Sequence, residues 1–245
     1  FVKEHPWANN IGLVLNFEAR GSGGPSNTIL ETNAGNQKLI KAFAKAHPEY
    51  PVATSLMYSV YKKLPNDTDA TVLREKKNVP SFFFAFIDDH YDYHTANDTF
   101  KNLDQNSLAH QASYLTSLMP YFSNVNLTKL TSEKESVYFN FPGIGMLYYS
   151  YALIIPLLIV AWLAFLGISM YAIRKKSFTA FSLVKNIVWF LVILTGSVLA
   201  TYFGFQLVQH NYPEYLENQN GFTSNGHYYI TAFVAITLAI SLLLY

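Results

Sequence analysis

Cysteine is absent from the 245 residues of this chain, and charged residues make up only 13% of it. Without cysteine there can be no thiolate catalysis, cysteine-ligated zinc or disulfide bonds, so a bound metal would have to be held by histidine and carboxylate side chains. Basic and acidic residues nearly balance, and the formal net charge is +1. A chain without a strong positive field is not expected to bind nucleic acid.

A secretory leader is also missing from the sequence. The chain begins with Phe1 rather than methionine, and no positively charged segment leads into a short apolar stretch. We therefore interpret the chain as a portion of a longer protein. Charged residues are frequent up to about Glu135, and apolar residues dominate the remainder, which predicts a soluble part followed by a membrane part.

The membrane part contains three long apolar segments, at residues 148–173, 187–208 and 228–245, and none of them contains a charged residue. A hydrocarbon core of about 30 Å needs about 20 apolar residues in a helix, so each segment is a candidate transmembrane helix. Buried helices of a soluble protein rarely run so far without a charge, and this alternative is disfavoured. We expect a multi-pass integral membrane protein in a lipid bilayer. A transporter is a weaker alternative, because no charged side chain inside the spans marks a transport path.

Basic residues indicate how these segments are oriented. The loop between the first two segments is assigned Arg174, Lys175, Lys176 and Lys185, whereas residues 209–227 contain no lysine or arginine. By the positive-inside rule the first loop is cytosolic, so the N-terminal part faces the lumen, the vacuole, the periplasm or the exterior. Acceptor sequons for N-glycosylation occur at residues 66–68, 97–99 and 126–128.

The soluble part alternates strand-like and helix-like segments. Apolar runs at residues 11–17 and 79–87 predict buried strands, residues 28–32 form a shorter strand-like element, and residues 36–47 predict a helix. Residues 54–61 fit either a strand or a helix. A further helix over residues 103–122 is expected to cover the sheet with an apolar face of Leu103, Leu108, Ala112, Leu115 and Leu118.

This order predicts a layered α/β domain over residues 1–130. A polar linker is expected over residues 131–147, with an aromatic approach to the bilayer near its end, and the membrane region over residues 148–245.

Candidate site residues come directly after the predicted strands. Glu18 succeeds the first run and opens a glycine-rich turn, and His94 lies in the aromatic and acidic loop after residues 79–87. The carboxyl ends of strands are where open α/β sheets place their ligands. Two plainer interpretations stay open: His94 is an ordinary loop histidine, and Glu18 pairs with Arg20. In the turn before the next helix, capping by an aspartate or threonine is favoured over metal binding by Asp67 or Asp69.

Three motifs occur in one order along the chain: NFEARG at residues 16–21 with Gly23 and Gly24, PNDTD at residues 65–69, and YHTANDT at residues 93–99. Together they resemble the second half of the di-zinc aminopeptidase and glutamate-carboxypeptidase family, metallopeptidase family twenty-eight, and in particular its membrane-anchored members. The motifs cover the resemblance over residues 1–122, and the remainder of the chain resembles the membrane-anchored members only in its order of segments.

The resemblance implies a three-layer α/β/α sandwich, here partial and followed by transmembrane helices, with two zinc ions and a peptide substrate. It implies that His94 ligates one zinc, that Glu18 ligates the other, and that Tyr93 hydrogen-bonds the oxyanion of the tetrahedral intermediate. A phenol placed where charge develops favours the transition state over the substrate. Supporting or structural roles around the site are implied for Asp98, Thr99, Asp67, Asp69 and Arg20.

The sequence also departs from the family. The family's other zinc histidine, its bridging aspartate, its glutamate ligand and its glutamate base are not found, and His5, His47 and His90 lack the context to replace the histidine. A catalytic zinc normally has three protein ligands. We therefore expect a portion of a membrane-bound zinc exopeptidase that is inactive by itself. The alternative is a non-catalytic, peptidase-like binding module on a membrane scaffold.

Overall fold

The structure is a computed structural model that describes residues 1–63, 67–177, 179–216 and 223–244. It consists of two compact units, Phe1–Ile154 and Ile155–Tyr245. Several sequence features lie outside the described residues: Pro65 and Asn66 of the second motif, Glu217, and the last residue of the third predicted span.

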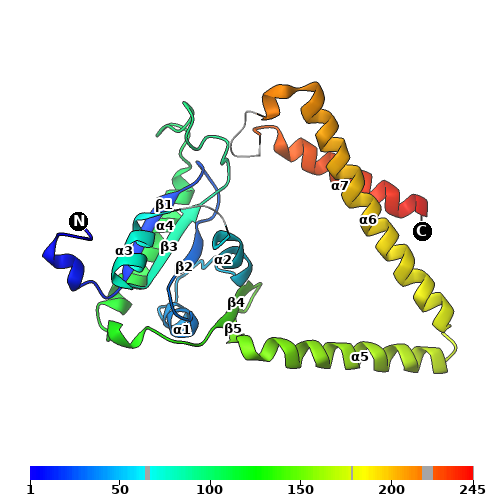
Figure 1. Cartoon of the computed structure of the whole chain (residues 1–245), viewed down its shortest axis with the longest axis horizontal. Helices are drawn as coiled ribbons and strands as arrows, with labels where there is room; N and C mark the ends of the chain where they lie inside the picture. The colour runs from blue at the N-terminus through cyan, green and yellow to red at the C-terminus, as the bar shows by residue number, and fades with distance from the viewer. Residues whose placement is uncertain (64–66, 178, 217–222, 245) are drawn as a thin grey trace. The chain divides into compact units, whose positions relative to one another are not determined.

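The first unit is built on a three-stranded sheet of β1 (Val14–Ala19), β2 (Asn27–Glu31) and β3 (Ser81–Phe86). The strand order is β1-β3-β2, with β1 parallel and β2 antiparallel to β3 (Figure 1). Every residue of β3 is buried, as expected for a central strand covered on both faces. The residues of β1, at one edge of the sheet, are only half-buried.

Helices cover both faces of this sheet. Phe82 and Phe84 of β3 contact Phe43 and Tyr114 on one face, while the side chain between them, Phe83, contacts Tyr61 on the opposite face. The alternation results from the two-residue period of a strand. The unit is thus a small α/β/α sandwich, as predicted. Its helices are α1 (Gln37–Lys45), α2 (Ser55–Tyr61), α3 (Asp69–Lys77) and α4 (Gln105–Phe122).

Helix α4 exists as predicted, but the predicted buried face was wrong. Leu108 is 45% exposed and Leu115 is 39% exposed, and of the expected stripe only Leu118 is fully buried. The face turned toward the sheet includes two polar residues that an apolar pattern cannot detect, because their side chains donate hydrogen bonds to backbone carbonyls. The buried residues of α4 are Ser107, Gln111, Tyr114, Leu118 and Phe122.

Residues 131–147, for which the sequence predicts a linker, contain most of an antiparallel hairpin, β4 (Ser136–Phe141) and β5 (Gly145–Ser150). Tyr138 of this hairpin is fully buried in the core of the first unit. The predicted first span therefore begins too early, because residues 148–150 belong to β5. The alternating apolar residues around a Pro-Gly turn are the hairpin signal in this segment.

The second unit contains the helices α5 (Ile154–Arg174), α6 (Ala180–Asn211) and α7 (Gly226–Leu244). Three helical segments are long and apolar enough to cross a membrane: Tyr151–Arg174, Ala180–Asn211 and Gly226–Leu244. This agrees with the predicted fold class, in which long apolar helices follow the α/β domain. Lys185, assigned from the sequence to the loop, lies inside α6.

Candidate active-site cleft

The loops after β1 and β3 lie side by side because these strands are parallel and end at the same edge of the sheet. Two backbone hydrogen bonds join them, from Arg20 N–H to Phe86 O at 3.0 Å and from Gly23 N–H to Asp88 O at 3.2 Å. A Cβ atom at Gly21 would lie 2.1 Å from Asp88 O. Glycine at this position is therefore what allows the two loops to approach each other so closely.

A cleft of about 190 Å³ lies beside these loops. It brings together side chains from all three motifs found in the sequence. It also includes residues of β3, α2 and the turn before α3. The residues that line it are Glu18, Arg20, Tyr61, Asp67, Thr68, Phe83 and Tyr93.

Glu18 is a residue of β1, because the strand extends beyond the predicted run and includes this position. Its Oε1 accepts a hydrogen bond of 2.7 Å from Asn16 Nδ2, two residues earlier on the same face of the strand. Its backbone oxygen accepts a bond of 2.6 Å from Gln111 Nε2, which also donates to Phe84 O at 3.2 Å. Gln111, which the sequence analysis missed, thus joins the ends of β1 and β3.

Arg20 contacts Tyr93 across the two loops. Its guanidinium lies 5.5 Å from the centroid of the Tyr93 ring, within the range of a cation–π interaction. Within the described residues, the ion pairs are those that Arg74 makes, and none joins Arg20 to Glu18. The alternative that Glu18 simply pairs with Arg20 is therefore wrong.

Tyr93 and His94 stack on each other, with ring centroids 3.9 Å apart and an angle of 19° between the rings. Tyr93 lines the cleft, whereas His94 is exposed and is not among the lining residues. The backbone of His94 is left-handed, with φ of 58°, which is uncommon for a residue other than glycine. The structure therefore brings Tyr93 and Glu18 to one cleft and leaves His94 at its margin.

The loop that carries Tyr93 and His94 is held by a residue that the sequence analysis did not single out. Asp92 is buried, and its Oδ2 accepts a hydrogen bond of 2.6 Å from Ser22 Oγ in the loop after β1. Its backbone oxygen accepts a bond of 2.7 Å from Thr95 Oγ1. Asp98 donates a backbone bond to Thr95 O, and Thr99 is exposed. The sequence signal that could have identified Asp92 is its position between two tyrosines shortly after a predicted buried strand.

The turn before α3 is organised by capping, as favoured from the sequence. Thr68 is the N-cap residue: its Oγ1 accepts from Thr71 N–H at 3.3 Å, and Thr71 Oγ1 accepts from Thr68 N–H at 3.1 Å. Asp69 lies in the first turn of the helix, where a negative charge is favourable. It borders a different pocket, next to residues 1–4, whereas Asp67 lines the cleft.

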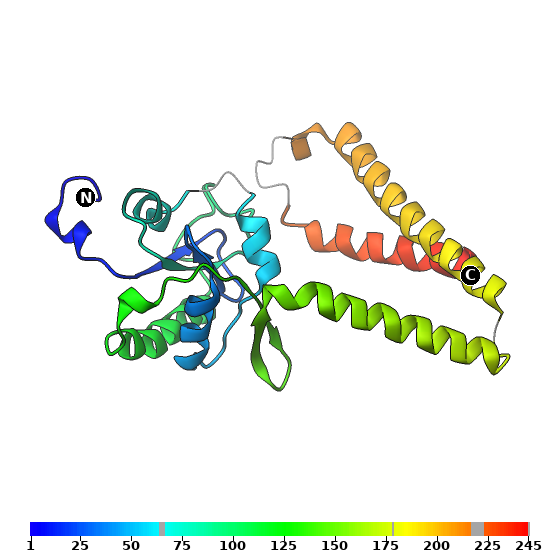
Figure 2. The ribbon, with the colours of Figure 1, turned by 60° about the horizontal axis from the view of Figure 1, so that its bottom comes forward.

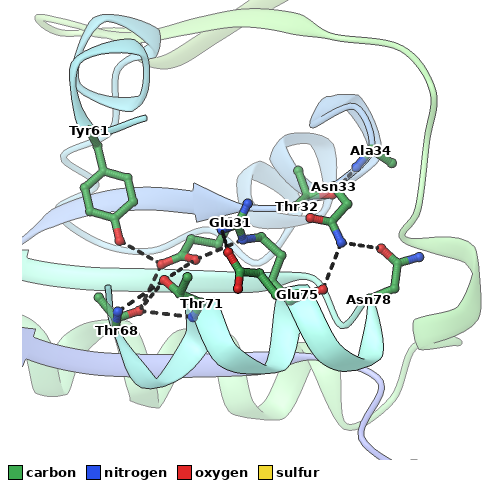
Figure 3. A network of polar contacts seen from close by, with 10 residues as sticks. Glu31, Thr32, Asn33, Ala34, Tyr61, Thr68, Thr71, Glu75 and Asn78 are labelled. Atoms are coloured by element: carbon green, nitrogen blue, oxygen red, sulfur yellow. Dashed lines mark hydrogen bonds and ion pairs between the residues drawn. The ribbon is translucent and has the colours of Figure 1, made fainter. Parts of the chain in front are cut away.

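One wall of the cleft is fixed by Glu31 at the end of β2 (Figure 3). This carboxylate is almost fully buried and accepts hydrogen bonds from Tyr61 Oη at 2.8 Å, Thr68 Oγ1 at 2.9 Å and Thr71 Oγ1 at 2.8 Å. Arg74 Nε lies 3.3 Å from its Oε2. Burial and the bond to Glu31 raise the pKa of Tyr61 to about 12. The network holds Tyr61 and Thr68 in place along the cleft.

The described residues contain no group of three or more histidine, aspartate or glutamate side chains that could hold a metal ion. Glu18 supplies an oxygen and His94 a nitrogen, and both are atoms that zinc accepts. Because a catalytic zinc takes three protein ligands, this part of the chain does not fit a complete zinc site.

Comparison with known proteins identifies the first unit. Residues 1–119 match the model of Peptidase family M28. Over these residues the chain is similar to peptidase family M28. This family is generally zinc-dependent. The resemblance read from the three motifs is thereby confirmed.

The relatives are named as metallopeptidases of the endoplasmic reticulum or as a vacuolar membrane protease. Endoplasmic reticulum metallopeptidase 1 of Rattus norvegicus is 29% identical over 154 residues, which cover 61% of this chain and 17% of the relative. The Homo sapiens protein of the same name is 25% identical over 219 residues, 82% of this chain and 24% of the relative. Vacuolar membrane protease of Candida dubliniensis is 31% identical over 141 residues, 57% of this chain and 14% of the relative.

The chain therefore spans a quarter or less of the length of these relatives. No solved structure matches it. The relatives and the three apolar helices together support a peptidase-like membrane protein.

Proposed function

We propose that this chain is the C-terminal part of the peptidase domain, with the first membrane spans, of a membrane-bound zinc exopeptidase of the aminopeptidase type. The observation that carries the proposal is the cleft that collects Glu18, Arg20, Asp67 and Tyr93 from three separate motifs. A peptide bound there would meet a carboxylate, a guanidinium and a phenol within one small volume. These groups suit the recognition and hydrolysis of an amide bond better than the binding of an apolar ligand.

Within this proposal each side chain has a separate role. Glu18 and His94 are zinc ligands, each to a different ion of the complete domain. Tyr93 donates a hydrogen bond from its hydroxyl to the oxyanion that develops on the substrate carbonyl. Arg20 orients the Tyr93 ring through the contact of 5.5 Å. Asp92 positions the loop that carries both Tyr93 and His94.

We also propose that the chain alone is inactive. Its described residues offer no group of three metal-binding side chains, so the further ligands and the general base must come from outside them. An open sheet edge supports this. The strand β1, which carries Glu18, pairs only with β3 in the described sheet, and its other side is free to pair with a further strand of a larger domain.

Zinc content and turnover test the proposal. The chain alone, purified in detergent, is expected to hold no stoichiometric zinc by elemental analysis and to leave aminoacyl-peptide substrates uncut. Tight, stoichiometric zinc with turnover by the chain alone would contradict it. The gene sequence before the codon for Phe1 is expected to encode a His-x-Asp motif and paired glutamates.

In the protein extended by that sequence, His94→Ala is expected to lower the zinc content and abolish peptide hydrolysis. The matched control is His47→Ala, because His47 is also exposed to solvent in part and also has a left-handed backbone, with φ of 49°. This variant is expected to keep both zinc and activity. Equal losses in the two variants would contradict a ligand role for His94.

The second candidate is a non-catalytic, peptidase-like binding module on a membrane scaffold. It is favoured by the margin position of His94 and by the lack of a three-ligand group among the described residues. Absence of the His-x-Asp and paired-glutamate motifs from the upstream sequence would support this candidate over the exopeptidase.

We further propose that the membrane unit is multi-pass and that the first unit faces the non-cytosolic side. Arg174, Lys175 and Lys176 cluster at the end of α5 and just after it, which fits a cytosolic loop. The sequon residues Asn97 and Asn126 both have side chains open to solvent on the first unit, as acceptors for N-linked glycans must.

A further inference from the structure

The hairpin β4–β5 differs from the rest of the first unit in its composition. From Ser136 to Ser150 it contains no charged side chain, although Glu133, Lys134 and Glu135 directly precede it. The helical segment that can cross a membrane begins at Tyr151, the residue after β5. The hairpin is thus an uncharged element next to the point where the chain enters the membrane.

The base of the hairpin is fixed to the first unit. Tyr138 is fully buried, and Ser136 exchanges two hydrogen bonds with the side chain of Asn36, at 2.7 and 3.2 Å. Tyr151 N–H donates to Glu135 O at 3.0 Å, so the first residue of the span is bonded to the residue before β4. These bonds fix the base of the hairpin to the residue at which the segment that can cross a membrane begins.

The tip of the hairpin is exposed and apolar. Burial decreases along β4 from Tyr138 to Phe141, which is 47% exposed, and Ile144 is 66% exposed. Between them, Gly143 has a φ of 76° and no atom within 4 Å of the place of a Cβ. In Figure 2 the hairpin, coloured green, extends away from the three-stranded sheet. The fold of the first unit does not bury this tip.

We propose that the tip of the hairpin, residues 141–144, inserts into the lipid interface of the membrane that the first span crosses. The transfer of apolar side chains out of water is favourable, and an uncharged turn brings no charged side chain that would oppose its entry into the headgroup region. Tyr148, which is 38% exposed, is the kind of side chain that collects at this level. Lipid is favoured over a protein partner because the tip ends only seven residues before Tyr151, where the segment that can cross a membrane begins.

Insertion would give the first unit a second attachment to the membrane, in addition to the chain itself. A single attachment leaves the unit free to tilt, whereas two attachments limit its orientation relative to the bilayer. The inference does not depend on peptidase chemistry, because it rests only on the hairpin and the membrane span.

The lack of native cysteine makes the test direct. The full chain with Ile144→Cys is labelled with an environment-sensitive fluorophore and reconstituted into phosphatidylcholine vesicles. The control is Phe100→Cys, because Phe100 is 78% exposed in a loop of the same unit and is far from the span in sequence. Quenching is measured with iodide in the water and with phospholipids that carry a spin label on the acyl chain.

The label at position 144 is expected to be quenched severalfold more by the spin-labelled lipid than the label at position 100, and severalfold less by iodide. A second label at Phe141→Cys is expected to repeat the pattern of position 144, which guards against a local effect of one substitution. Free access of iodide to position 144 would overturn the proposal. Protection from both quenchers would also overturn it, since the tip would then be covered by protein.

Discussion

The guanidinium of Arg20 lies 5.5 Å from the ring centroid of Tyr93, and this contact joins the loop after β1 to the loop after β3. The same two loops are also joined by the bond from Ser22 to the buried carboxylate of Asp92. Two side-chain contacts and two backbone bonds therefore set the distance between the motif that contains Glu18 and the motif that contains Tyr93.

Replacing Arg20 by alanine is expected to loosen the Tyr93 loop without unfolding the unit. A cation–π contact near the surface stabilises by about 0.5–1 kcal/mol, which corresponds to a roughly two- to fivefold change in local opening. Amide hydrogen exchange across residues 90–97 is expected to accelerate by that factor. The control is Lys62→Ala, which removes the contact of Lys62 with Tyr58 elsewhere in the unit. Unchanged exchange in Arg20→Ala would contradict an orienting role.

The hydrogen bond from Tyr61 to Glu31 predicts an alkaline limit to stability. The pKa of Tyr61 is raised from 10.0 to about 12, so the folded unit holds the phenolic proton more tightly than the unfolded chain. The stabilising contribution is complete below pH 10.0 and is lost as the pH rises to about 12. The difference in tyrosinate absorbance between the wild type and Tyr61→Phe is expected to titrate near that higher value.

Glu31→Gln separates the two causes of this shift. Burial is the larger cause and remains in the variant, whereas the negative charge that opposes ionisation is removed. The pKa of Tyr61 is therefore expected to fall only part of the way toward 10.0. A pKa that does not move at all would show that Glu31 has no part in it.

Gly21→Ala is expected to destabilise the first unit, because the new Cβ would lie 2.1 Å from Asp88 O and 2.8 Å from Ile87 O. Backbone atoms cannot move aside as a side chain can, and overpacking of this kind costs about 1–3 kcal/mol. The matched control is Gly23→Ala, whose nearest contact is the mobile end of the Asp89 side chain at 3.0 Å. Thermal unfolding is expected to separate the two variants, and equal midpoints would contradict the argument.

The sheet and the adjacency of Glu18 and Tyr93 could be predicted because both result from local patterns. An apolar run predicts a buried strand, and two parallel strands bring the loops after them to one edge of the sheet. The role of Glu31 as the shared acceptor of three side-chain hydrogen bonds could not be predicted. Its partners Tyr61, Thr68 and Thr71 lie 30, 37 and 40 residues further along the chain, and only the packing of α2 and α3 brings them to it.

Both errors made from the sequence arose because hydropathy alone does not show which side chains the fold buries. Gln111 is polar, yet it is buried because its amide donates to two backbone carbonyls, so hydropathy assigned the wrong face to α4. In residues 131–147 the aromatic residues suggested an approach to the bilayer. The buried position of Tyr138 and the hydrogen bonds between Ser136 and Asn36 show that this segment belongs to the folded unit.

The proposed orientation in the membrane predicts where single cysteines can be labelled. Ser177→Cys lies between α5 and α6, Ser224→Cys lies just before α7, and Phe100→Cys lies in the first unit, and all three side chains are exposed. When a membrane-impermeant maleimide is added to sealed microsomes, it is expected to label position 177 only. Positions 224 and 100 are expected to be labelled after detergent opens the membrane. Labelling of positions 177 and 100 from the same side would contradict the proposed orientation.

The face that α4 turns toward the sheet can be tested with two leucines of the same helix. Leu118 is fully buried, whereas Leu115 is 39% exposed. Leu118→Ala leaves a cavity in the core and is expected to cost about 2–5 kcal/mol of the free energy of unfolding. Leu115→Ala removes a partly exposed side chain and is expected to cost less than about 1 kcal/mol. Thermal unfolding and hydrogen exchange of the β3 amides measure both costs. If Leu115→Ala were the more damaging substitution, the face of α4 that contains Gln111 and Leu118 would not be the face that packs on the sheet.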